Sequence, residues 1–168
     1  SAEKMKQFLE HHEIDMEDLK TWEKHVEEEK IRLVKKGQLG LYPGTQKLLE
    51  SLDVPKALVS NAYAEATDEL VKYLGLDEHF EFWKAPHLDD IEAYVESMKP
   101  NPDMLEEAMK VMDSEKALMV GDSDSDVKAA ENAGIDSVYI DRSGRKSEKA
   151  TFNVESLEEV GRIVKGEA

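Results

Sequence analysis

The sequence of 168 residues has no cysteine, only five prolines and 7% aromatic residues, and it contains no long apolar run. Without cysteine there is no disulfide, no zinc–thiolate site and no thiol catalysis, which fits a reducing compartment. No stretch is long and apolar enough to cross a bilayer, and charges throughout the first ten residues argue against a signal peptide. We therefore expect a cytoplasmic protein that works away from membranes.

Positive charge is also scarce: 22 lysine and arginine residues face 38 aspartate and glutamate residues, giving a formal net charge of −16. Such a surface repels nucleic acid phosphates and anionic membranes, so neither is expected as a partner. It repels phosphorylated small molecules too, and a phosphate site would need local positive charge from a lysine or a metal. A length of 168 residues is enough for one domain, or for one domain with a small appendage.

The first 40 residues are predicted to form a small helical module. Residues 2 to about 36 read as two helices, and Asp15 is a favourable N-cap for the second. Helical spacing predicts a set of inward side chains on this second helix, namely Met16, Leu19, Trp22, Val26 and Ile31. Residues 37–44 read as a linker because they contain glycine and a Pro-Gly turn signal.

Residues 41–168 are predicted to form an α/β core. Predicted strands lie at 57–59, 80–83, 117–120, 137–140 and near 152, and predicted helices lie at 46–52, 62–74, 91–98, 102–112, 127–133 and 156–164. Strands that alternate with helices indicate a Rossmann-like parallel sheet with helices on both of its faces.

The segment Gly121-Asp122-Ser123-Asp124-Ser125-Asp126 follows an apolar run and precedes a helical segment. The carboxyl end of a buried parallel strand opens onto the crevice in which such sheets bind ligands. Clustered carboxylates repel one another unless a cation joins them, and oxygen-only ligands suit Mg²⁺. The alternative is a solvated turn that caps a helix, because Asp and Ser are favoured N-cap residues.

Ser60, Asn61 and Lys99 are the other polar groups expected at this rim of the sheet. Ser60 and Asn61 end the strand at 57–59, and Lys99 stands before Pro100 in a segment with two prolines. A hydroxyl, an ammonium group and a carboxylate-bound cation together would neutralise a dianionic phosphoryl group. A plain strand end and a plain helix entry are the alternatives.

Taken in order, these segments resemble the motifs of the haloacid dehalogenase (HAD) superfamily, and they resemble its phosphatase branch. Leu41-Tyr42-Pro43-Gly44-Thr45 is similar to the return from cap to core, Leu58-Val59-Ser60-Asn61 to the second motif, Lys99-Pro100-Asn101-Pro102 to the third, Gly121 to Asp126 to the fourth, and Thr151-Phe152-Asn153-Val154 to the closing segment. The resemblance covers roughly residues 41–164.

The resemblance implies a function and a role for each site residue. Ser60 and the backbone of Asn61 would bind the transferring phosphoryl group, and Lys99 would offset the negative charge on nucleophile and phosphate. Asp122 would ligate Mg²⁺, and Asp126 would support the metal or Lys99. The implied activity is Mg²⁺-dependent hydrolysis of a phosphate monoester, with a phosphorylated small molecule as the substrate. The helical module would be the family's small cap.

One family motif is missing from the sequence. In the family, a first strand ending in Asp-x-Asp precedes the cap, and its first aspartate is the nucleophile; no such segment occurs before residue 41. In the family this strand lies centrally, between the strands of the second and fourth motifs. Three outcomes remain open: the chain is a fragment, it borrows the strand from another chain as in a homodimer, or those two strands pair directly. We predict no appreciable phosphatase activity for the chain alone.

Two other functions fit parts of this pattern. A non-catalytic HAD-like binding or regulatory module would keep the Mg²⁺ and phosphate contacts without turnover, and the acidic helices of residues 1–36 would meet a basic partner. A response-regulator receiver domain also combines aspartates, Mg²⁺, a hydroxyl and a lysine. Its lysine, however, follows the acidic cluster, whereas Lys99 precedes it.

Overall fold

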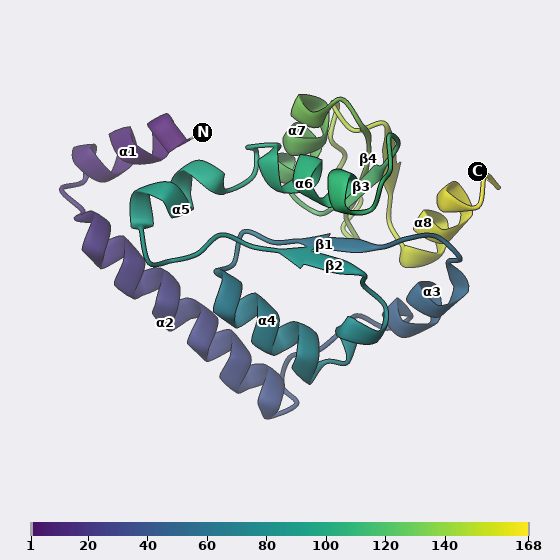
Figure 1. The fold of residues 1–168 in the computed structure, drawn as a ribbon, viewed down its shortest axis with the longest axis horizontal. Coiled ribbons are helices and arrows are strands. Elements are labelled where there is room, and N and C mark those ends of the chain that lie inside the picture. The colour runs from purple at the N-terminus through teal and green to yellow at the C-terminus, as the bar shows by residue number, and fades with distance from the viewer. Residues whose placement is uncertain (1, 168) are drawn as a thin grey trace.

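A computed structural model describes residues 2–167 of the protein, and the side chains of residues 7–167. Its elements are α1 (Ala2–His11), α2 (Met16–Lys35), α3 (Thr45–Ser51), β1 (Ala57–Val59), α4 (Ala64–Tyr73), the 3₁₀ helix η1 (Leu76–Glu78), β2 (Phe82–Lys84), α5 (Ile91–Ser97), α6 (Asp103–Val111), β3 (Leu118–Gly121), α7 (Asp124–Ala133), β4 (Asp136–Ile140), β5 (Phe152–Val154) and α8 (Leu157–Val164) (Figure 1). This order confirms the predicted α/β class. No helix in this part of the chain combines the length and apolar character needed to cross a bilayer.

The strands of the described residues form two parallel sheets rather than one. The first has the order β1-β2, with Leu58 opposite Trp83, and the second has the order β3-β4-β5, with Val120 opposite Val138. In Figure 1, β1 and β2 run side by side through the centre, and β3 and β4 lie above them. The direct pairing of β1 with β3, one of the three outcomes considered for the missing strand, is therefore wrong for residues 2–167.

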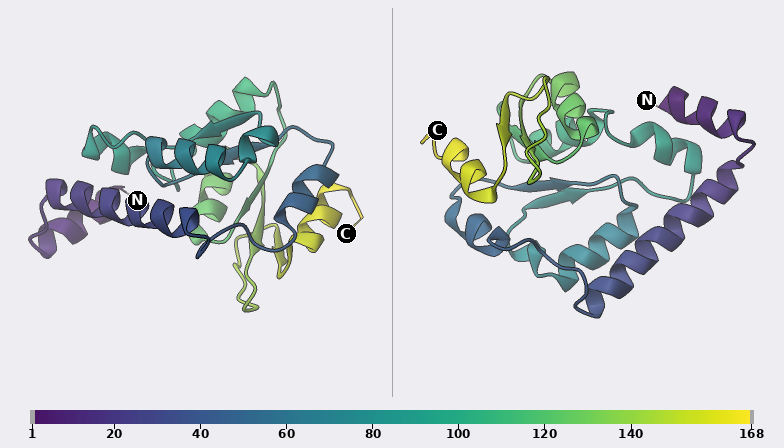
Figure 2. Two further views of the ribbon diagram at one scale, coloured as in Figure 1. Left: turned by 90° about the horizontal axis from the view of Figure 1, so that it is seen from below. Right: turned by 180° about the vertical axis from the view of Figure 1, so that it is seen from behind.

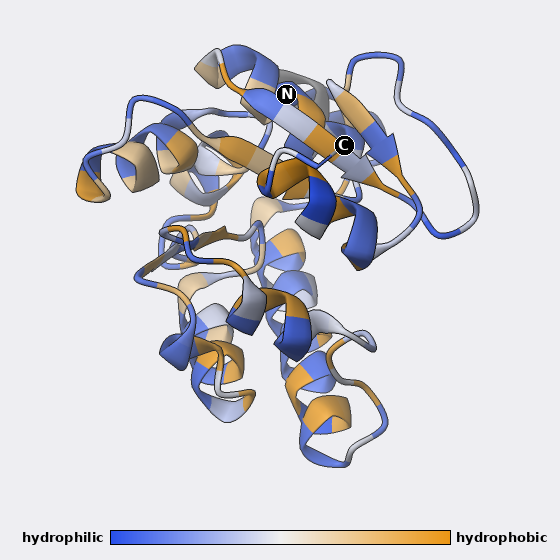
Figure 3. Ribbon diagram, turned by 90° about the vertical axis from the view of Figure 1, so that its right-hand side faces the viewer, coloured by the Kyte–Doolittle hydropathy of each residue, from blue (hydrophilic) through white to orange (hydrophobic). Residues whose placement is uncertain are grey.

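The described residues include two hydrophobic core clusters, and only the second contains strand residues. The first core joins α2 and α5 to the start of α4 and is formed by Ile31, Tyr63, Ala66, Leu88, Ile91, Tyr94 and Val95. The second joins β4, β5 and α8 and is formed by Val138, Ile140, Val154 and Val160, with Leu48 of α3 packed against it. Both views of Figure 2 show α3 beside α8. Figure 3 shows helices that alternate between apolar and polar residues, as expected for helices with one buried face.

The inward face of α2 matches the predicted one except at Trp22. Trp22 is 59% exposed, whereas Ile31 and the carboxylate-bearing Glu27 are buried. Met16 and Leu19 pack against the core that contains Ile31, as predicted, and Val26 is partly buried. Glu23 is half-buried on the same helix. The prediction for Trp22 is wrong because it considered only the spacing of apolar residues. Glu27 is buried on this helix instead and forms an ion pair with Lys30 at 2.6 Å.

Helix α6 links the two sheets. It packs against β1 and β2 on one side and against α7 on the other. The segment that precedes α6 contains Lys99, and the turn that precedes α7 contains Asp122 and Ser123. The packing of α6 therefore brings together two polar segments that are about twenty residues apart in the sequence.

Candidate functional site

The Lys99 ammonium group joins the carboxyl ends of β1 and β3. Its Nζ lies 2.7 Å from Asp126 Oδ1 in α7 and donates a hydrogen bond of 2.7 Å to the carbonyl oxygen of Val59 in β1. The side chains of Lys99 and Asp126 are only 8% and 9% exposed. A buried charge of this kind needs a paired partner and further hydrogen bonds, and Lys99 has both.

Asn61 fixes the backbone on which Lys99 stands. Its Oδ1 accepts a hydrogen bond of 2.7 Å from the Lys99 N–H, and its Nδ2 donates one of 3.1 Å to the Lys99 carbonyl. The Asn61 carbonyl in turn accepts a hydrogen bond of 2.8 Å from the Tyr94 hydroxyl. Burial raises the pKa of Tyr94, so this hydroxyl remains a neutral donor at physiological pH.

Ser60 stands at the point where β1 ends. Its N–H donates to the Lys84 carbonyl at 3.0 Å, which continues the pairing with β2, and its Oγ accepts a hydrogen bond of 3.1 Å from the Ala62 N–H. The hydroxyl retains its proton for donation, because it acts only as an acceptor in this contact. Ser60 directly follows Val59, the residue that Lys99 contacts, so both polar groups belong to one rim.

Asp126 is held at the start of α7 by Ser123. Its Oδ2 accepts hydrogen bonds from the Ser123 N–H at 3.1 Å and the Ser123 Oγ at 2.6 Å, while the Ser123 Oγ also accepts from the Asp126 N–H. This reciprocal arrangement is a capping box. With Oδ1 on Lys99 and Oδ2 on Ser123, both carboxylate oxygens have partners.

Gly121 makes room for the Asp126 side chain. A Cβ atom built on Gly121 would lie 2.4 Å from Asp126 Cβ and 2.5 Å from its Oδ2, which no real Cβ atom tolerates. The glycine at the end of β3 is therefore required by close packing, since its backbone φ is not in the left-handed region. Because Gly121 has no side chain, the buried Asp126 side chain can pack against it, whereas Asp122 is exposed.

Asp122 lies at the start of the turn that precedes α7, and its carboxylate is exposed. Asp124 is exposed too, and no hydrogen bond or ion pair of the described residues engages the Asp122 carboxylate. No group of three or more acidic or histidine side chains within residues 7–167 is placed to hold a metal. Mg²⁺ often binds through one or two carboxylates and keeps several waters or phosphate oxygens as its other ligands. The exposed Asp122 carboxylate fits this mode of Mg²⁺ binding.

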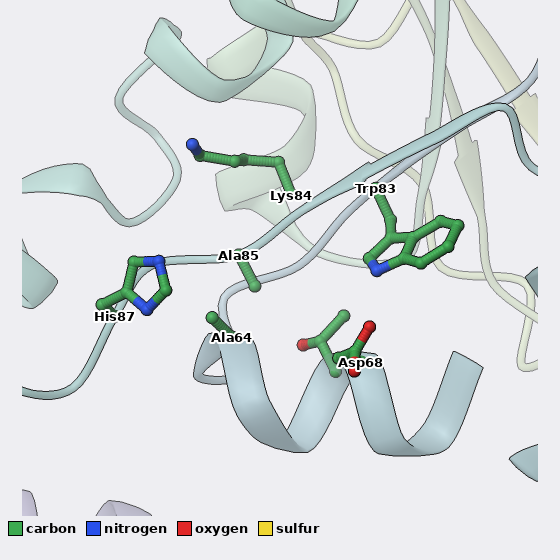
Figure 4. Close-up of a pocket in the computed structure, with 7 residues that line it drawn as sticks. Ala64, Asp68, Trp83, Lys84, Ala85 and His87 are labelled. Atoms are coloured by element: carbon green, nitrogen blue, oxygen red, sulfur yellow. The ribbon is translucent and has the colours of Figure 1, made fainter. Parts of the chain in front are cut away.

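Two surface hollows lie outside this cluster. One, of about 210 Å³, lies between α4 and β2 and is lined by Thr67, Asp68, Trp83, Lys84 and His87, among others (Figure 4). The other, of about 480 Å³, lies beside Pro100 and Lys128. Neither is lined by Ser60, Lys99 or Asp122. The candidate site therefore lies at an open rim of the strands in this structure. The contacts of Lys99 hold its segments together.

Several residues that hold this rim together could not be identified from the sequence. The Asn132 side chain donates a hydrogen bond of 2.8 Å to the Pro100 carbonyl, which ties α7 to the Lys99 segment. Asp141, at the end of β4, accepts hydrogen bonds from Ser143 and Arg145. The contacts of Asn132 and Tyr94 are long-range, so no local pattern announces them. The Asp-x-Ser spacing after β4 is the one local signal in the sequence.

Comparison with known protein families and curated relatives gives a consistent result. A family model described as haloacid dehalogenase-like hydrolase matches residues 1–140. The pyrophosphatase PpaX of Halalkalibacterium halodurans is 34% identical over 122 residues, which cover 71% of this chain and 53% of that protein. A phosphoglycolate phosphatase of Rhodobacter capsulatus is 30% identical over 110 residues, which cover 64% of this chain and 48% of that protein. The chain thus spans about half the length of these curated relatives.

Solved structures share the fold over almost the whole chain. The crystal structure of a putative beta-phosphoglucomutase from Thermotoga maritima matches with a TM-score of 0.68 and 25% identity, covering 94% of this chain and 74% of that one. A HAD phosphatase from Thermococcus onnurineus matches with a TM-score of 0.66 and 24% identity, covering 96% of this chain and 71% of that one. These matches agree with the Rossmann-like architecture predicted from the sequence.

Proposed function

Because the chain belongs to the haloacid dehalogenase-like hydrolase family, we propose that it carries the phosphate- and Mg²⁺-binding part of a phosphate monoester hydrolase site. Its substrate is a phosphorylated small molecule, and its relatives with phosphatase and pyrophosphatase names support that class. The observation that carries the proposal is the buried Lys99 ammonium group between Asp126 and the end of β1. In a chain of net charge −16, a fixed cation at a strand-end rim is what an anionic substrate needs.

In this proposal each rim residue has a separate task. The Ser60 hydroxyl and the Asn61 backbone N–H donate hydrogen bonds to phosphoryl oxygens, and Lys99 offsets their charge. Asp126 positions the Lys99 ammonium group through their ion pair and supports the metal site. Asp122 is the carboxylate that holds Mg²⁺. A bound Mg²⁺ supplies Lewis-acid stabilisation of charge on the phosphoryl oxygens.

The nucleophile for a covalent step is not among these residues. Residues 1–168 include no strand ending in Asp-x-Asp ahead of the helical module, and Asp122 and Asp124 are already assigned to the acidic segment after β3. We therefore propose that residues 1–168 alone bind phosphate and Mg²⁺ without appreciable turnover. Robust Mg²⁺-dependent hydrolysis of a generic phosphate ester by this chain, lost in Asp122→Asn, would contradict that part of the proposal.

Thermal unfolding in the presence of Mg²⁺ and a fluoride phosphate mimic tests the proposal. Ligands that bind only the folded state raise the melting temperature by mass action. We expect a clear increase that needs both components and that disappears in Asp122→Asn and in Ser60→Ala. Asp53→Asn, which removes an exposed carboxylate elsewhere, is the matched control and keeps the response. No increase for the unaltered chain contradicts the proposed site.

A non-catalytic binding or regulatory module that keeps the Mg²⁺ and phosphate contacts is the second candidate. The acidic run Glu27-Glu28-Glu29 in α2 supplies a surface for a basic partner, although Glu27 itself is buried. Because such a module keeps the Mg²⁺ and phosphate contacts, it also responds to Mg²⁺ and the mimic, and binding of a basic partner to the acidic helices is what distinguishes it. A cytoplasmic location fits either candidate and is part of the proposal.

A further inference from the structure

The loop between β4 and β5 carries a concentration of positive charge. Positions 142–149 hold one acidic residue, Glu148, and four basic residues, namely Arg142, Arg145, Lys146 and Lys149. The chain as a whole has a formal net charge of −16, so this loop reverses the prevailing sign. Figure 2 shows it in yellow-green beside the strands of the second sheet. Both of its guanidinium groups are held in place, each by a different neighbour.

Asp141 fixes the guanidinium group of Arg145. The Arg145 Nε donates a hydrogen bond of 2.7 Å to Asp141 Oδ2, and Nη2 lies 2.6 Å from the same oxygen. Asp141 Oδ1 accepts a hydrogen bond of 2.7 Å from the Ser143 N–H, so both carboxylate oxygens are engaged. The Asp141 side chain is 6% exposed, whereas that of Arg145 is 75% exposed. A buried carboxylate therefore orients an exposed guanidinium group, which has further N–H donors for an anion.

Tyr42 supports the second guanidinium group. The Cζ atom of Arg142 lies 3.6 Å from the centroid of the Tyr42 ring, so the guanidinium group stands over the ring. Tyr42 belongs to the linker between α2 and α3 and is itself exposed. A guanidinium group that contacts a ring in this way keeps the N–H donors at its edge for other partners. Arg142 and Arg145 are thus two positioned cations, three positions apart in one loop.

The loop begins at the edge of the second sheet that also carries the acidic turn. Strands β3 and β4 are parallel neighbours, so Asp141 follows β4 at the same edge at which Asp122 follows β3. Hydrogen bonding to Asp141 raises the pKa of Arg145, and the charge of Asp124 in the first turn of α7 raises it further. The Arg145 guanidinium group therefore lies within the electrostatic field of the acidic turn.

We propose that Arg145 and Arg142 bind a second oxyanion of the substrate, a carboxylate or phosphate group that is a few bonds away from the transferring phosphoryl group. The inference rests on the proposed function, in which the rim holds that phosphoryl group beside the acidic turn. A guanidinium group matches two oxygens of a carboxylate or phosphate with parallel N–H donors, so it selects an oxyanion over a neutral polar group. Asp141 and Tyr42 are positioning residues, because they act through the two arginines.

The overall charge of the protein predicts the opposite effect of a second negative charge on the ligand. A chain of net charge −16 repels each added anionic group. Without a local cation, a doubly anionic ligand would therefore bind less tightly than a ligand of the same length with a neutral tail. Tighter binding of the doubly anionic ligand identifies a positive subsite, and loss of that preference on substitution assigns its residues.

Isothermal titration calorimetry with two matched series of phosphonates, in the presence of Mg²⁺, tests the inference. One series carries a carboxylate separated from phosphorus by one, two or three methylene groups, and the other carries a methyl group in place of the carboxylate. A further arm replaces the carboxylate by a second phosphonate and distinguishes the two oxyanions. We expect at least one length to bind about tenfold more tightly with a charged tail. Equal or weaker binding of every charged ligand overturns the inference, whereas failure of all the ligands to bind contradicts the proposed function and the inference with it.

Substitutions assign the preference for the charged tail to the two arginines. Arg145→Gln is expected to reduce it to about twofold or less, whereas Arg162→Gln, which removes an exposed arginine in α8, keeps it. Tyr42→Ala should lower the preference about threefold, and Tyr42→Phe, which retains the aromatic ring, should keep it. A preference that persists in Arg145→Gln overturns the inference, and equal preferences in Tyr42→Ala and Tyr42→Phe overturn the role given to Arg142.

Discussion

Lys99 and Asp126 form a buried ion pair, with Nζ and Oδ1 2.7 Å apart, although 27 positions separate them in the sequence. Together with α6, the pair links the two sheets, because Lys99 also donates a hydrogen bond to the Val59 carbonyl at the end of β1. The two side chains are only 8% and 9% exposed. Removing one of them would leave a buried charge without a partner, which lowers the stability of the fold. The integrity of the candidate site and the stability of the fold therefore depend on the same contact.

Lys99→Met is expected to destabilise the protein by about 3 kcal/mol, because removing one partner of a buried pair leaves an uncompensated charge. Urea unfolding of this variant, of Asp126→Leu and of the double variant measures the effect. The double variant should lose about 1–3 kcal/mol less free energy of unfolding than the sum of the losses in the two single variants. Strictly additive losses would show that the two side chains do not interact.

Gly121→Ala is expected to reduce the free energy of unfolding by about 1–3 kcal/mol, as overpacking does in well-packed sites. The new methyl group would overlap the Asp126 side chain, whose nearest atom lies 2.4 Å from the position that the added Cβ would take. Gly40→Ala is the matched control, since nothing lies within 4 Å of its added Cβ. Equal stability of the two variants in urea unfolding would refute the close packing described for Gly121.

Asp141 makes the stability of the fold depend on pH in the acid range. A hydrogen bond from the Ser143 hydroxyl, aided by Arg145, lowers the pKa of Asp141 from 3.8 to about 2. With the pKa depressed in the folded state, the ionised carboxylate stabilises the fold above pH 3.8, and this stabilisation is lost as the pH falls toward 2. The melting temperature of Asp141→Asn should therefore lie below that of the unaltered protein at pH 7, with a gap that narrows below about pH 4. A gap independent of pH contradicts this account.

Glu23→Gln is expected to stabilise the protein at neutral pH. Burial, together with the charge of Glu27, raises the pKa of Glu23, so its ionised form is disfavoured in the folded state. The gain is at most about 1 kcal/mol, because the side chain is only half-buried and partly screened by solvent. Since protonation of Glu23 removes the same penalty, the two proteins should converge in melting temperature as the pH is lowered. A destabilised Glu23→Gln at pH 7 would show that Glu23 accepts a necessary hydrogen bond.

Local sequence patterns predicted much of the fold. The strand predicted at residues 57–59 is β1, and the helix predicted at 91–98 matches α5 to within one residue. Short apolar runs bounded by polar or glycine residues identified these strands, and regularly spaced apolar residues identified the helices. The order of Ser60, Lys99 and the acidic segment after β3 identified the family, which the comparisons confirm.

Long-range packing could not be predicted in the same way. The buried face of α2 depends on its contacts with α4 and α5, so Trp22 was placed inward by a pattern that the tertiary structure overrides. The two hydrogen bonds between the Asn61 side chain and the Lys99 backbone join residues 38 positions apart. The division into two sheets depends on strand pairing, and pairing is not encoded in any one segment.

Paramagnetic broadening by Mn²⁺ tests most directly whether the rim binds one metal ion. Mn²⁺ takes the same oxygen ligands as Mg²⁺ and broadens amide signals close to it. We predict that, with inorganic phosphate present, sub-stoichiometric Mn²⁺ broadens the signals of Ser60, Lys99 and Asp122 together, and that Asp122→Asn abolishes the effect. Broadening confined to the acidic helices, with the signals of Ser60 and Lys99 unchanged, would contradict the account.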